Sequence, residues 1–316
     1  MRVLIYGGGA VGLGIASCLV RSGCAVDIVA RDVTVDALRS DGLTRTGLFG
    51  VVEAKPGTFG ACSSLVELGS EPYEWVLVCT KSFDSAQATV DLAAYRDATG
   101  HNVRLVLFQN GWGNAAQFAR QFPPESIYSA RVITGFHRHR PNEVEVTVHA
   151  DAIHIGSLTA TDLSGLGDLC RCIQEGGIPC EVVTNVAADL WAKMLYNCAL
   201  NPLGAILNVT YGALAAHTTT QTLMNSVIDE VFTVMTGAGY QTHWDTPQGF
   251  IRTFYEKLVP DTAQHESSML QDIAAGKRTE IDALNGAIIR LADEQGVPVP
   301  HNRSVYNLIK FVESKR

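Results

Sequence analysis

The chain has 316 residues, which is more than one compact core usually holds and suits two domains. Hydrophobic residues make up 47% of it and charged residues 18%, so it can bury a large core and is not expected to be disordered. The formal net charge of −8 argues against a nucleic-acid binder or a protein that docks on anionic membranes, because such surfaces are basic. We therefore expect a small molecule as the partner.

Cysteine usage indicates a reducing compartment. The eight cysteines include no CxxC pair, and several stand in apolar stretches, where a reduced thiol behaves as a small hydrophobic group. This pattern favours a cytoplasmic protein over a disulfide-linked secreted one and predicts no metal site. The apolar run after Arg2 resembles a signal peptide or a short membrane span, but its five glycines argue against both.

The first half of the chain alternates predicted strands with predicted helices. We expect strands at 3–6, 25–30, 75–80, 103–108, 127–133 and 180–183, and helices at 10–21, from 82, from 112 and at 162–175. This alternation is typical of a mostly parallel sheet with helices on both faces. The apolar residues alternate from Val144 to Ile155, which predicts an antiparallel hairpin at the sheet edge.

The second half contains no convincing strand. Helical segments are expected at 186–207, 219–238, 246–258, 265–275, 279–295 and 303–314, separated by glycine and proline. We therefore predict an α/β fold in which an N-terminal Rossmann-type parallel sheet with an antiparallel edge is followed by an all-α C-terminal domain. The predicted domains are an NADP-binding domain over 1–184 and a helical substrate and catalytic domain over 185–316.

A glycine-rich turn follows the first predicted strand. It fits the pattern G-x-G-x-x-G and consists of Gly7, Gly8, Gly9, Ala10, Val11 and Gly12. Gly7 allows the tight turn, Gly9 lets the backbone approach a pyrophosphate, and Gly12 lets the helix pack closely on the strand. The helix N-terminus then receives the phosphates. The alternative is a glycine-rich loop that binds no ligand. The strand before the turn and the helix after it favour the phosphate-binding turn.

Three residues at strand ends bear on the cofactor. Arg31 would pair with the 2′-phosphate of NADP, whereas Asp32 would take the ribose hydroxyl of NAD or cap the next helix. We favour NADP. Lys81 follows another predicted strand, at a carboxyl end of the sheet where ligands collect, although a lysine there is often only solvated.

A polar line runs along the predicted helix at 186–207. Lys193, Asn197 and Asn201 are spaced four residues apart and share one face, while their neighbours are apolar. A surface helix with an Asp189–Lys193 pair is the alternative, but it does not account for two asparagines on the same line. The segments 267–272 and 279–282 read by themselves as ordinary helix caps.

Six motifs, taken in chain order, resemble those of the ketopantoate reductase (2-dehydropantoate 2-reductase) family. They are GGGAVG (7–12), TK (80–81), QNGWGN (109–114), WAKMLYNCALNP (191–202), SSMLQD (267–272) and TEIDALNG (279–286). The resemblance covers nearly the whole chain, and its last three motifs are the specific ones. It implies an NADPH-binding Rossmann domain, a helical domain and a substrate cleft between them.

On the substrate side, the resemblance implies that Lys193 is the general acid, that Asn197 and Asn201 hold substrate, and that Ser268 binds its carboxylate or hydroxyl end. Asn110 would touch both nicotinamide ribose and substrate. The chemistry agrees with these residue types, because hydride addition to a 2-keto acid leaves an alkoxide that needs a cation able to donate a proton.

On the cofactor side, the resemblance implies that Arg31 and Lys81 bind the adenosine phosphate region and that Glu280 contacts the cofactor ribose or orients the lysine. With the glycine turn and Asn110, these residues complete the expected cofactor set.

The chain departs from the family pattern at the expected substrate end. Tyr211 stands where an asparagine is common, and His265 occupies another position that is often asparagine. The segment 133–141 also differs from the family's small-residue stretch. Its two histidines, at 137 and 139, supply too few ligands for a metal, so we expect a solvated loop there.

The predicted function is NADPH-dependent reduction of a small 2-keto acid, with ketopantoate to pantoate as the favoured reaction and a homodimer left open. One alternative is an NAD-dependent hydroxyacid dehydrogenase that uses Asp32. The other is a non-catalytic dinucleotide sensor, which would have no need of the Lys193 line.

Overall fold

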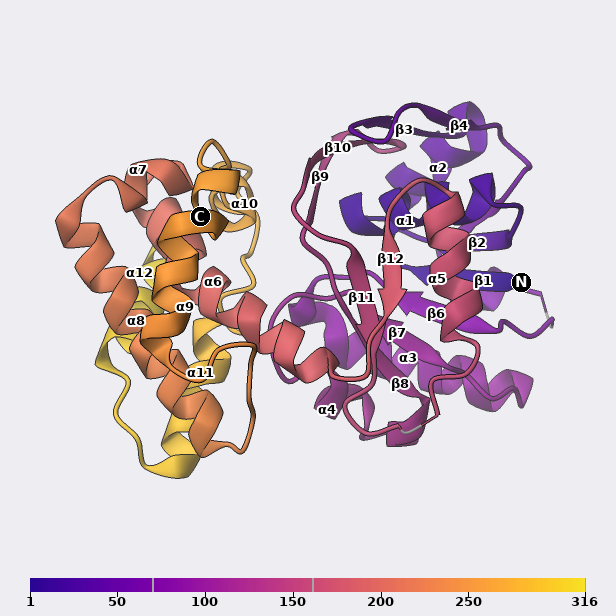
Figure 1. The fold of residues 1–316 in the computed structure, drawn as a ribbon. Coiled ribbons are helices and arrows are strands. Elements are labelled where there is room, and N and C mark those ends of the chain that lie inside the picture. Colours follow the sequence, from indigo (N-terminus) through magenta and orange to yellow (C-terminus); the bar gives the residue numbers. More distant parts are fainter. Residues whose placement is uncertain (70, 161, 316) are drawn as a thin grey trace. The chain divides into compact units, whose positions relative to one another are not determined.

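The computed structural model describes residues 1–69, 71–160 and 162–315 and divides the chain into two compact units (Figure 1). The first unit comprises Met1–Gln109 and Asn114–Val186, and the second comprises Asn110–Gly113 and Ala187–Arg316. The short segment 110–113 therefore belongs with the helical half of the chain, although it follows a strand of the first unit.

The first unit is built on two sheets. Its strands are β1 (Arg2–Tyr6), β2 (Ala25–Val29), β3 (Leu43–Gly47), β4 (Val52–Ala54), β5 (Gly60–Cys62), β6 (Trp75–Val78), β7 (Leu105–Leu107), β8 (Ile127–Arg131), β9 (Thr134–Arg140), β10 (Glu143–His149), β11 (Ile153–Gly156) and β12 (Cys180–Val182). Its α-helices are α1 (Ala10–Arg21), α2 (Asp32–Asp41), α3 (Ser85–Thr99), α4 (Asn114–Phe118) and α5 (Leu166–Glu175). Short 3₁₀ turns are η1 (Leu65–Glu67), η2 (Ser82–Asp84) and η3 (Pro124–Ser126).

The large sheet has the order β12-β11-β8-β7-β6-β1-β2-β5. All its pairings are parallel except that of β11 with β8. Its six consecutive strands from β5 to β8 follow the 3-2-1-4-5-6 order of the Rossmann fold, with the change of direction between β1 and β6. The predicted fold class, including the antiparallel strand towards one edge, is confirmed.

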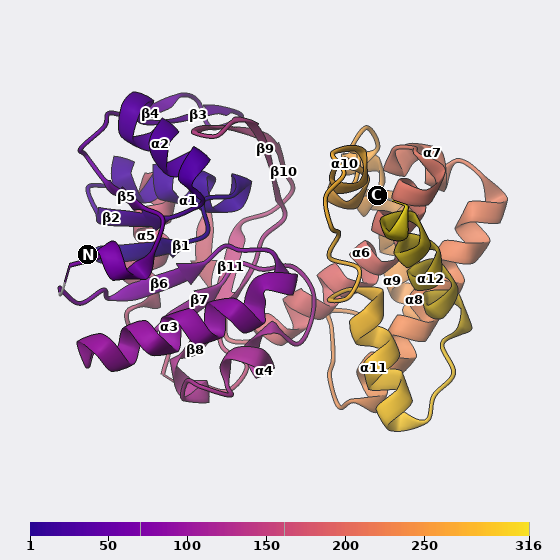
Figure 2. The same ribbon diagram turned by 180° about the vertical axis from the view of Figure 1, so that it is seen from behind.

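Alternate residues of the strands bury two different cores. In β1, Val3 and Ile5 pack with α1 and α5, whereas Leu4 packs with α3 and α4 on the other face. Figures 1 and 2 show these two faces of the unit, with α5 towards the viewer in the first and α3 in the second. Because both faces are covered, strands β6 and β7 in the middle of the sheet are apolar at every position, as buried parallel strands usually are.

Helix α1 lies between two sheets. It packs on β1 and β2 on one side and on the four-stranded sheet β4-β3-β10-β9 on the other. Its residues from Gly12 to Leu19 are consequently all buried. Small side chains make this possible, and at Gly14 a Cβ atom would lie 2.3 Å from the ring of Phe136 on β9.

The second sheet corrects two sequence predictions. Strands β10 and β11 do not form the expected hairpin, because β10 pairs with β9 and β3 while β11 joins the large sheet beside β8. The stretch around 137–140, expected as a solvated loop, is strand β9 and pairs with β10. The alternation of apolar residues correctly predicts strands at these positions, but it does not specify which strands pair.

All the regular elements that the structure describes in the second unit are helices. Its α-helices are α6 (Val186–Leu207), α7 (Tyr211–Ala215), α8 (Thr218–Gly237), α9 (Pro247–Thr253), α10 (Ser268–Ala274), α11 (Asn285–Gln295) and α12 (Pro300–Ser314), with a π-helical turn η4 (Phe254–Leu258) and a 3₁₀ turn η5 (Pro260–Thr262). Helix α6 has the predicted bounds. The helix expected from 279 begins at Asn285 instead, and the backbone N–H and hydroxyl of Thr279 donate to the Glu313 carboxylate of α12.

Candidate functional site

The glycine turn at the carboxyl end of β1 leaves no room for side chains. Gly7 has φ +117°, and a Cβ atom there would lie 2.7 Å from the backbone of Thr80. At Gly12 a Cβ atom would lie 2.0 Å from the carbonyl oxygen of Gly7, so the helix and the strand end are in direct backbone contact. Gly9 forms the N-cap of α1 without a side-chain hydrogen bond. These features fit a pyrophosphate-binding turn and the N-terminal amides of a helix.

The end of β2 is the second part of this region. Gly8 faces it, since a Cβ atom on Gly8 would lie 2.5 Å from that of Ala30. Arg31 is the N-cap residue of α2 and is exposed, and Asp32 is the first helical residue and is also exposed. Arg31 and Asp32, the two residues predicted to distinguish NADP from NAD, therefore directly follow the strand end that lies against Gly8.

Lys81 lies after β6, the neighbour of β1 in the sheet. Its backbone forms the N-cap of η2, and its carbonyl accepts a hydrogen bond of 3.3 Å from the amide of Gln109. The same amide donates to the hydroxyl of Thr80 over 3.2 Å. The carboxyl ends of β6 and β7 are thus joined through Gln109, which is buried.

The segment 110–113 is anchored in the helical unit by its backbone and its tryptophan. Gly111 has φ +90°, and a Cβ atom there would lie 2.4 Å from the carbonyl oxygen of Ala283. That carbonyl accepts a 2.9 Å hydrogen bond from the backbone N–H of Trp112. The Trp112 ring lies 4.5 Å from Trp191 on α6 and 4.7 Å from Tyr240. The sequence did not predict this anchoring role of Trp112. Its one signal is that the motif QNGWGN places a tryptophan directly between two glycines.

Lys193, Asn110 and Glu280 form a chain of hydrogen bonds within the helical unit. The Lys193 ammonium donates to Asn110 Oδ1 over 2.7 Å, and Asn110 Nδ2 donates to Glu280 Oε2 over 3.0 Å. These contacts join residues 83 and 170 positions apart in the sequence. The orientation of the Asn110 amide is fixed by its neighbours, since only its oxygen can face an ammonium and only its nitrogen can face a carboxylate.

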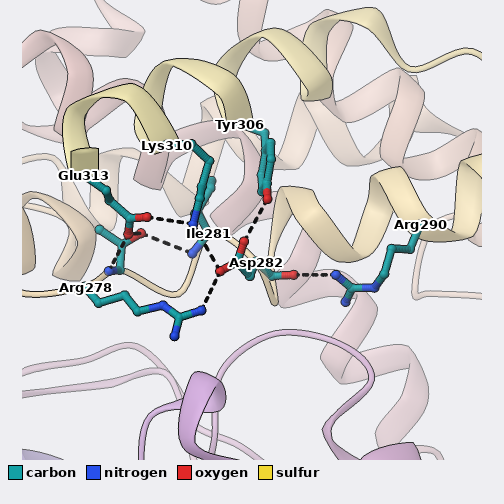
Figure 3. A network of polar contacts seen from close by, with 8 residues as sticks. Arg278, Ile281, Asp282, Arg290, Tyr306, Lys310 and Glu313 are labelled. Atoms are coloured by element: carbon teal, nitrogen blue, oxygen red, sulfur yellow. Dashed lines mark hydrogen bonds and ion pairs between the residues drawn. The ribbon is translucent and has the colours of Figure 1, made fainter. Parts of the chain in front are cut away.

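The turn that carries Glu280 is held by a network of charged groups (Figure 3). The Asp282 carboxylate accepts hydrogen bonds from Tyr306 over 2.9 Å and from Arg278 over 3.0 Å, and it lies 3.4 Å from Lys310. Burial by itself raises the pKa of Asp282, but the hydrogen bonds from Arg278 and Tyr306 and the charge of Lys310 outweigh it and hold that pKa below its usual value.

Glu313 on α12 fixes the start of the same turn. Its carboxylate accepts the backbone N–H of Thr279 over 2.8 Å and the Thr279 hydroxyl over 2.7 Å, and it forms a 2.9 Å ion pair with Lys310. Burial opposes the charged form of Glu313, yet these partners lower its pKa. The network therefore positions Glu280, which is itself only 6% exposed, from the adjoining residues.

The two asparagines of the polar line differ in their surroundings. Asn197 is 8% exposed, and among the described residues its amide has no hydrogen-bond partner. Asn201 is occupied on one side, because its Oδ1 accepts a 2.7 Å hydrogen bond from Tyr211. Burial raises the pKa of Tyr211 well above its ordinary value, so the phenol stays a donor at neutral pH.

Ser267 and Ser268 at the start of α10 have separate roles. Ser267 is buried as the N-cap; its hydroxyl accepts from the backbone of Leu270 over 3.0 Å and donates to the carbonyl of Asn201 over 3.2 Å. Ser268 is exposed and, in the part of the chain that the structure describes, makes no side-chain hydrogen bond. Of the pair, only the Ser268 hydroxyl is available to a ligand.

The two residues that depart from the expected substrate pattern lie together. The rings of Tyr211 and His265 are 5.3 Å apart, and the backbone N–H of Tyr211 donates to the carbonyl of His265 over 3.1 Å. Burial lowers the pKa of His265, although the nearby Glu266 opposes the shift, so the neutral imidazole is favoured.

Two searches of the described residues bear on other kinds of site. No group of three or more His, Cys, Asp and Glu side chains is arranged to hold a metal ion there. Within those residues, too, every helix is too short or too polar to span a bilayer.

Comparisons with family models and with known proteins point to the same family. The model for the C-terminal domain of ketopantoate reductase PanE/ApbA matches residues 185–313, and the model for ketopantoate reductase PanE/ApbA matches residues 3–160. The chain is 35% identical to 2-dehydropantoate 2-reductase of Aquifex aeolicus over 99% of its own length and 97% of that protein.

Solved structures resemble the whole chain. A PanE/ApbA family ketopantoate reductase from Ralstonia eutropha is 31% identical, covers 100% of this chain and 99% of its own, and has a TM-score of 0.86. D-mandelate dehydrogenase, solved with NADH and anilino(oxo)acetate, has a TM-score of 0.87 with 22% identity, covers 100% of this chain and 99% of its own, and so shares the fold.

Proposed function

Because this chain belongs to the ketopantoate reductase PanE/ApbA family, we propose that it reduces a small 2-keto acid with NADPH, and that the substrate is ketopantoate (2-dehydropantoate). The observation that carries the proposal is the Lys193–Asn110–Glu280 chain of hydrogen bonds, in which Asn110 links the ammonium of Lys193 on α6 to the buried carboxylate of Glu280. The names of the relatives support ketopantoate as the substrate.

The sheet unit supplies the cofactor site in this proposal. The glycine turn, where a Cβ atom on Gly7 or Gly12 would strike backbone, accepts the pyrophosphate. Arg31 takes the 2′-phosphate of NADPH, and Lys81 lies at the neighbouring strand end to contact the adenosine phosphate region. When bound, the reduced nicotinamide supplies a hydride to the carbonyl carbon of the keto acid.

Lys193 supplies the proton. Its Nζ gives a proton to the substrate oxygen as negative charge develops there, and the lysine is left as a neutral amine that takes a new proton from solvent. Asn110 acts by orienting Nζ through its Oδ1, and its own amide is fixed by Glu280. A positioned donor of this kind contributes roughly 10²–10⁴-fold to such reactions.

Neutral polar groups on α6 and α10 hold the rest of the substrate. Asn197 offers an amide without another partner among the described residues, and Ser268 offers an exposed hydroxyl. Because Tyr211 already occupies Oδ1 of Asn201, the Asn201 group left for substrate is its Nδ2 donor. These donors suit a carboxylate or hydroxyl oxygen.

The experiment is a turnover assay of the purified protein with NADPH and with NADH. The substrate panel contains ketopantoate, pyruvate and 3,3-dimethyl-2-oxobutanoate, which differs from ketopantoate only in lacking the hydroxyl. We expect NADPH-dependent turnover of ketopantoate and a loss of roughly 10–100-fold in kcat/KM without the hydroxyl, because a donor in the site is then left unpaired.

Other results would separate the alternatives. A preference for NADH would favour a hydroxyacid dehydrogenase that uses Asp32, whereas tight binding of NADPH without turnover of any keto acid would favour a dinucleotide sensor. In the NADPH reductase, Arg31→Ala lowers the affinity for NADPH and leaves that for NADH nearly unchanged. A cytoplasmic location and a homodimer remain predictions.

A further inference from the structure

Strand β9 brings a second arginine to the glycine turn. Phe136 of β9 fills the space above Gly14 of α1, where a Cβ atom would lie 2.3 Å from its ring. Side chains two residues apart on a strand point to the same side, so Arg138 faces the same way as Phe136. The packing of Phe136 on Gly14 therefore fixes the position of Arg138 at the start of α1.

Arg138 contacts the turn and the neighbouring helix directly. Its Nη1 donates to the carbonyl oxygen of Gly8 over 3.0 Å and lies 3.4 Å from the hydroxyl oxygen of Thr34 on α2. Gly8 and Arg138 are 130 residues apart in the sequence. A guanidinium has five N–H donors, so these contacts leave donors for a ligand.

The positive charges of Arg31 and Arg138 interact here. Within the described residues, neither Arg31 nor Arg138 forms an ion pair. Burial lowers the pKa of Arg138, and the positive charge of Arg31 lowers it further. Like charges held together at partial burial cost stability unless an anion binds between them.

We propose that Arg138 is a second ligand of the 2′-phosphate of NADPH, acting beside Arg31, so that the N-cap residue of α2 and a residue of strand β9 together set the choice of cofactor. The inference rests on the proposed function, since it assumes that the glycine turn holds NADPH. A phosphate dianion held by two guanidinium groups is bound more tightly than by one, because each adds charge-assisted hydrogen bonds.

The contacts favour the 2′-phosphate over the pyrophosphate. In a Rossmann fold the pyrophosphate lies at the N-terminus of the first helix, whereas the ribose lies at the end of the second strand. Both neighbours of Arg138 lie just after β2: Arg31 is the N-cap residue of α2, and Thr34 lies in the first turn of that helix. Arg138 therefore acts where NADPH and NADH differ.

The test compares cofactor affinity in Arg138→Gln, in the conservative Arg138→Lys and in a matched control, Arg140→Gln. Arg140 lies on the same strand but is 73% exposed and pairs with Glu143. Dissociation constants are measured for NADPH and NADH, and for 2′,5′-ADP and 5′-AMP, with the melting temperature of each free protein. We expect Arg138→Gln to weaken NADPH and 2′,5′-ADP by roughly 10–100-fold, with NADH and 5′-AMP nearly unchanged.

Arg138→Lys keeps the charge without the planar fork and should recover part of the affinity for NADPH, while Arg140→Gln should match the parent. An equal loss for NADPH and NADH in Arg138→Gln would overturn the proposal, because a structural role or a pyrophosphate contact affects both cofactors alike. Unchanged NADPH affinity would also overturn it. If the parent binds both cofactors equally, the proposed use of NADPH fails as well; if the parent prefers NADPH, only the role of Arg138 is refuted.

Discussion

Replacement of Lys193 by methionine tests the catalytic proposal most directly. Methionine keeps an unbranched apolar side chain of similar length, so packing of the stem on α6 is retained while the ammonium is removed. The change takes away the group that donates to Asn110 Oδ1 over 2.7 Å and, in the proposed reaction, the proton donor itself. The effect on the barrier should therefore exceed the effect on folding.

The expected magnitudes follow from these two losses. Loss of a positioned general acid lowers kcat by roughly 10²–10⁴-fold, which corresponds to about 3–5 kcal/mol of barrier. Loss of the charge-assisted hydrogen bond to Asn110 contributes about 1.5–3 kcal/mol to the decrease in the free energy of unfolding. Affinity for NADPH should change little, because the proposed phosphate ligands lie in the other unit.

The assay measures kcat and KM for ketopantoate, the dissociation constant of NADPH and the melting temperature. Lys193→Arg separates charge from proton transfer, since arginine keeps a cation but does not give up its proton near neutral pH. Lys257→Met is the matched control, because Lys257 is an exposed lysine of the same unit. If Lys193→Met turns over ketopantoate at the parent rate, Lys193 is not the general acid and the reasoning is refuted.

Three further changes test the two regions separately. Gly12→Ala should abolish detectable NADPH binding and lower the melting temperature, because its Cβ would lie 2.0 Å from the Gly7 carbonyl oxygen; normal binding would contradict the close packing. Tyr211→Phe unpairs Oδ1 of Asn201 and should destabilise the fold by about 1–3 kcal/mol in urea unfolding and raise KM more than it lowers kcat. Since the pKa of Asp282 is below its usual value, its stabilisation is complete above the unfolded-state pKa and is lost as pH falls through the folded-state pKa. Thermal melts should accordingly lose less stability between about pH 5 and 3 in Asp282→Asn than in the parent, and parallel pH profiles would contradict this.

Local sequence pattern determined the elements that carry both candidate regions. The first strand, the glycine turn and the helix at 10–21 followed from an apolar run, closely spaced glycines and helical periodicity, and α1 has those bounds. The four-residue spacing of Lys193, Asn197 and Asn201 likewise placed them on one face of α6. These features depend on neighbours within a few turns, which is the range over which sequence periodicity carries information.

Pairing between distant strands was decided by the tertiary structure. The alternation from Val144 to Ile155 identified strands correctly, but the hairpin assigned to them was wrong because β10 and β11 belong to different sheets. The four-stranded sheet joins β3 and β10 in parallel across a long stretch of sequence. An apolar face marks the side that is buried, and it does not specify which partner buries it.

The contacts that give the candidate residues their chemistry are also products of the tertiary fold. Asn110 bridges Lys193 and Glu280 only because Trp112 and Gly111 fix its segment on the helical unit. The sequence predicts that Arg138 lies in a solvated loop. Its contact with the glycine turn depends on the packing of the four-stranded sheet on α1, which local sequence does not specify. Hydrogen bonds need atoms placed within a few tenths of an ångström, and over such sequence separations that precision comes from the packed cores rather than from local propensity.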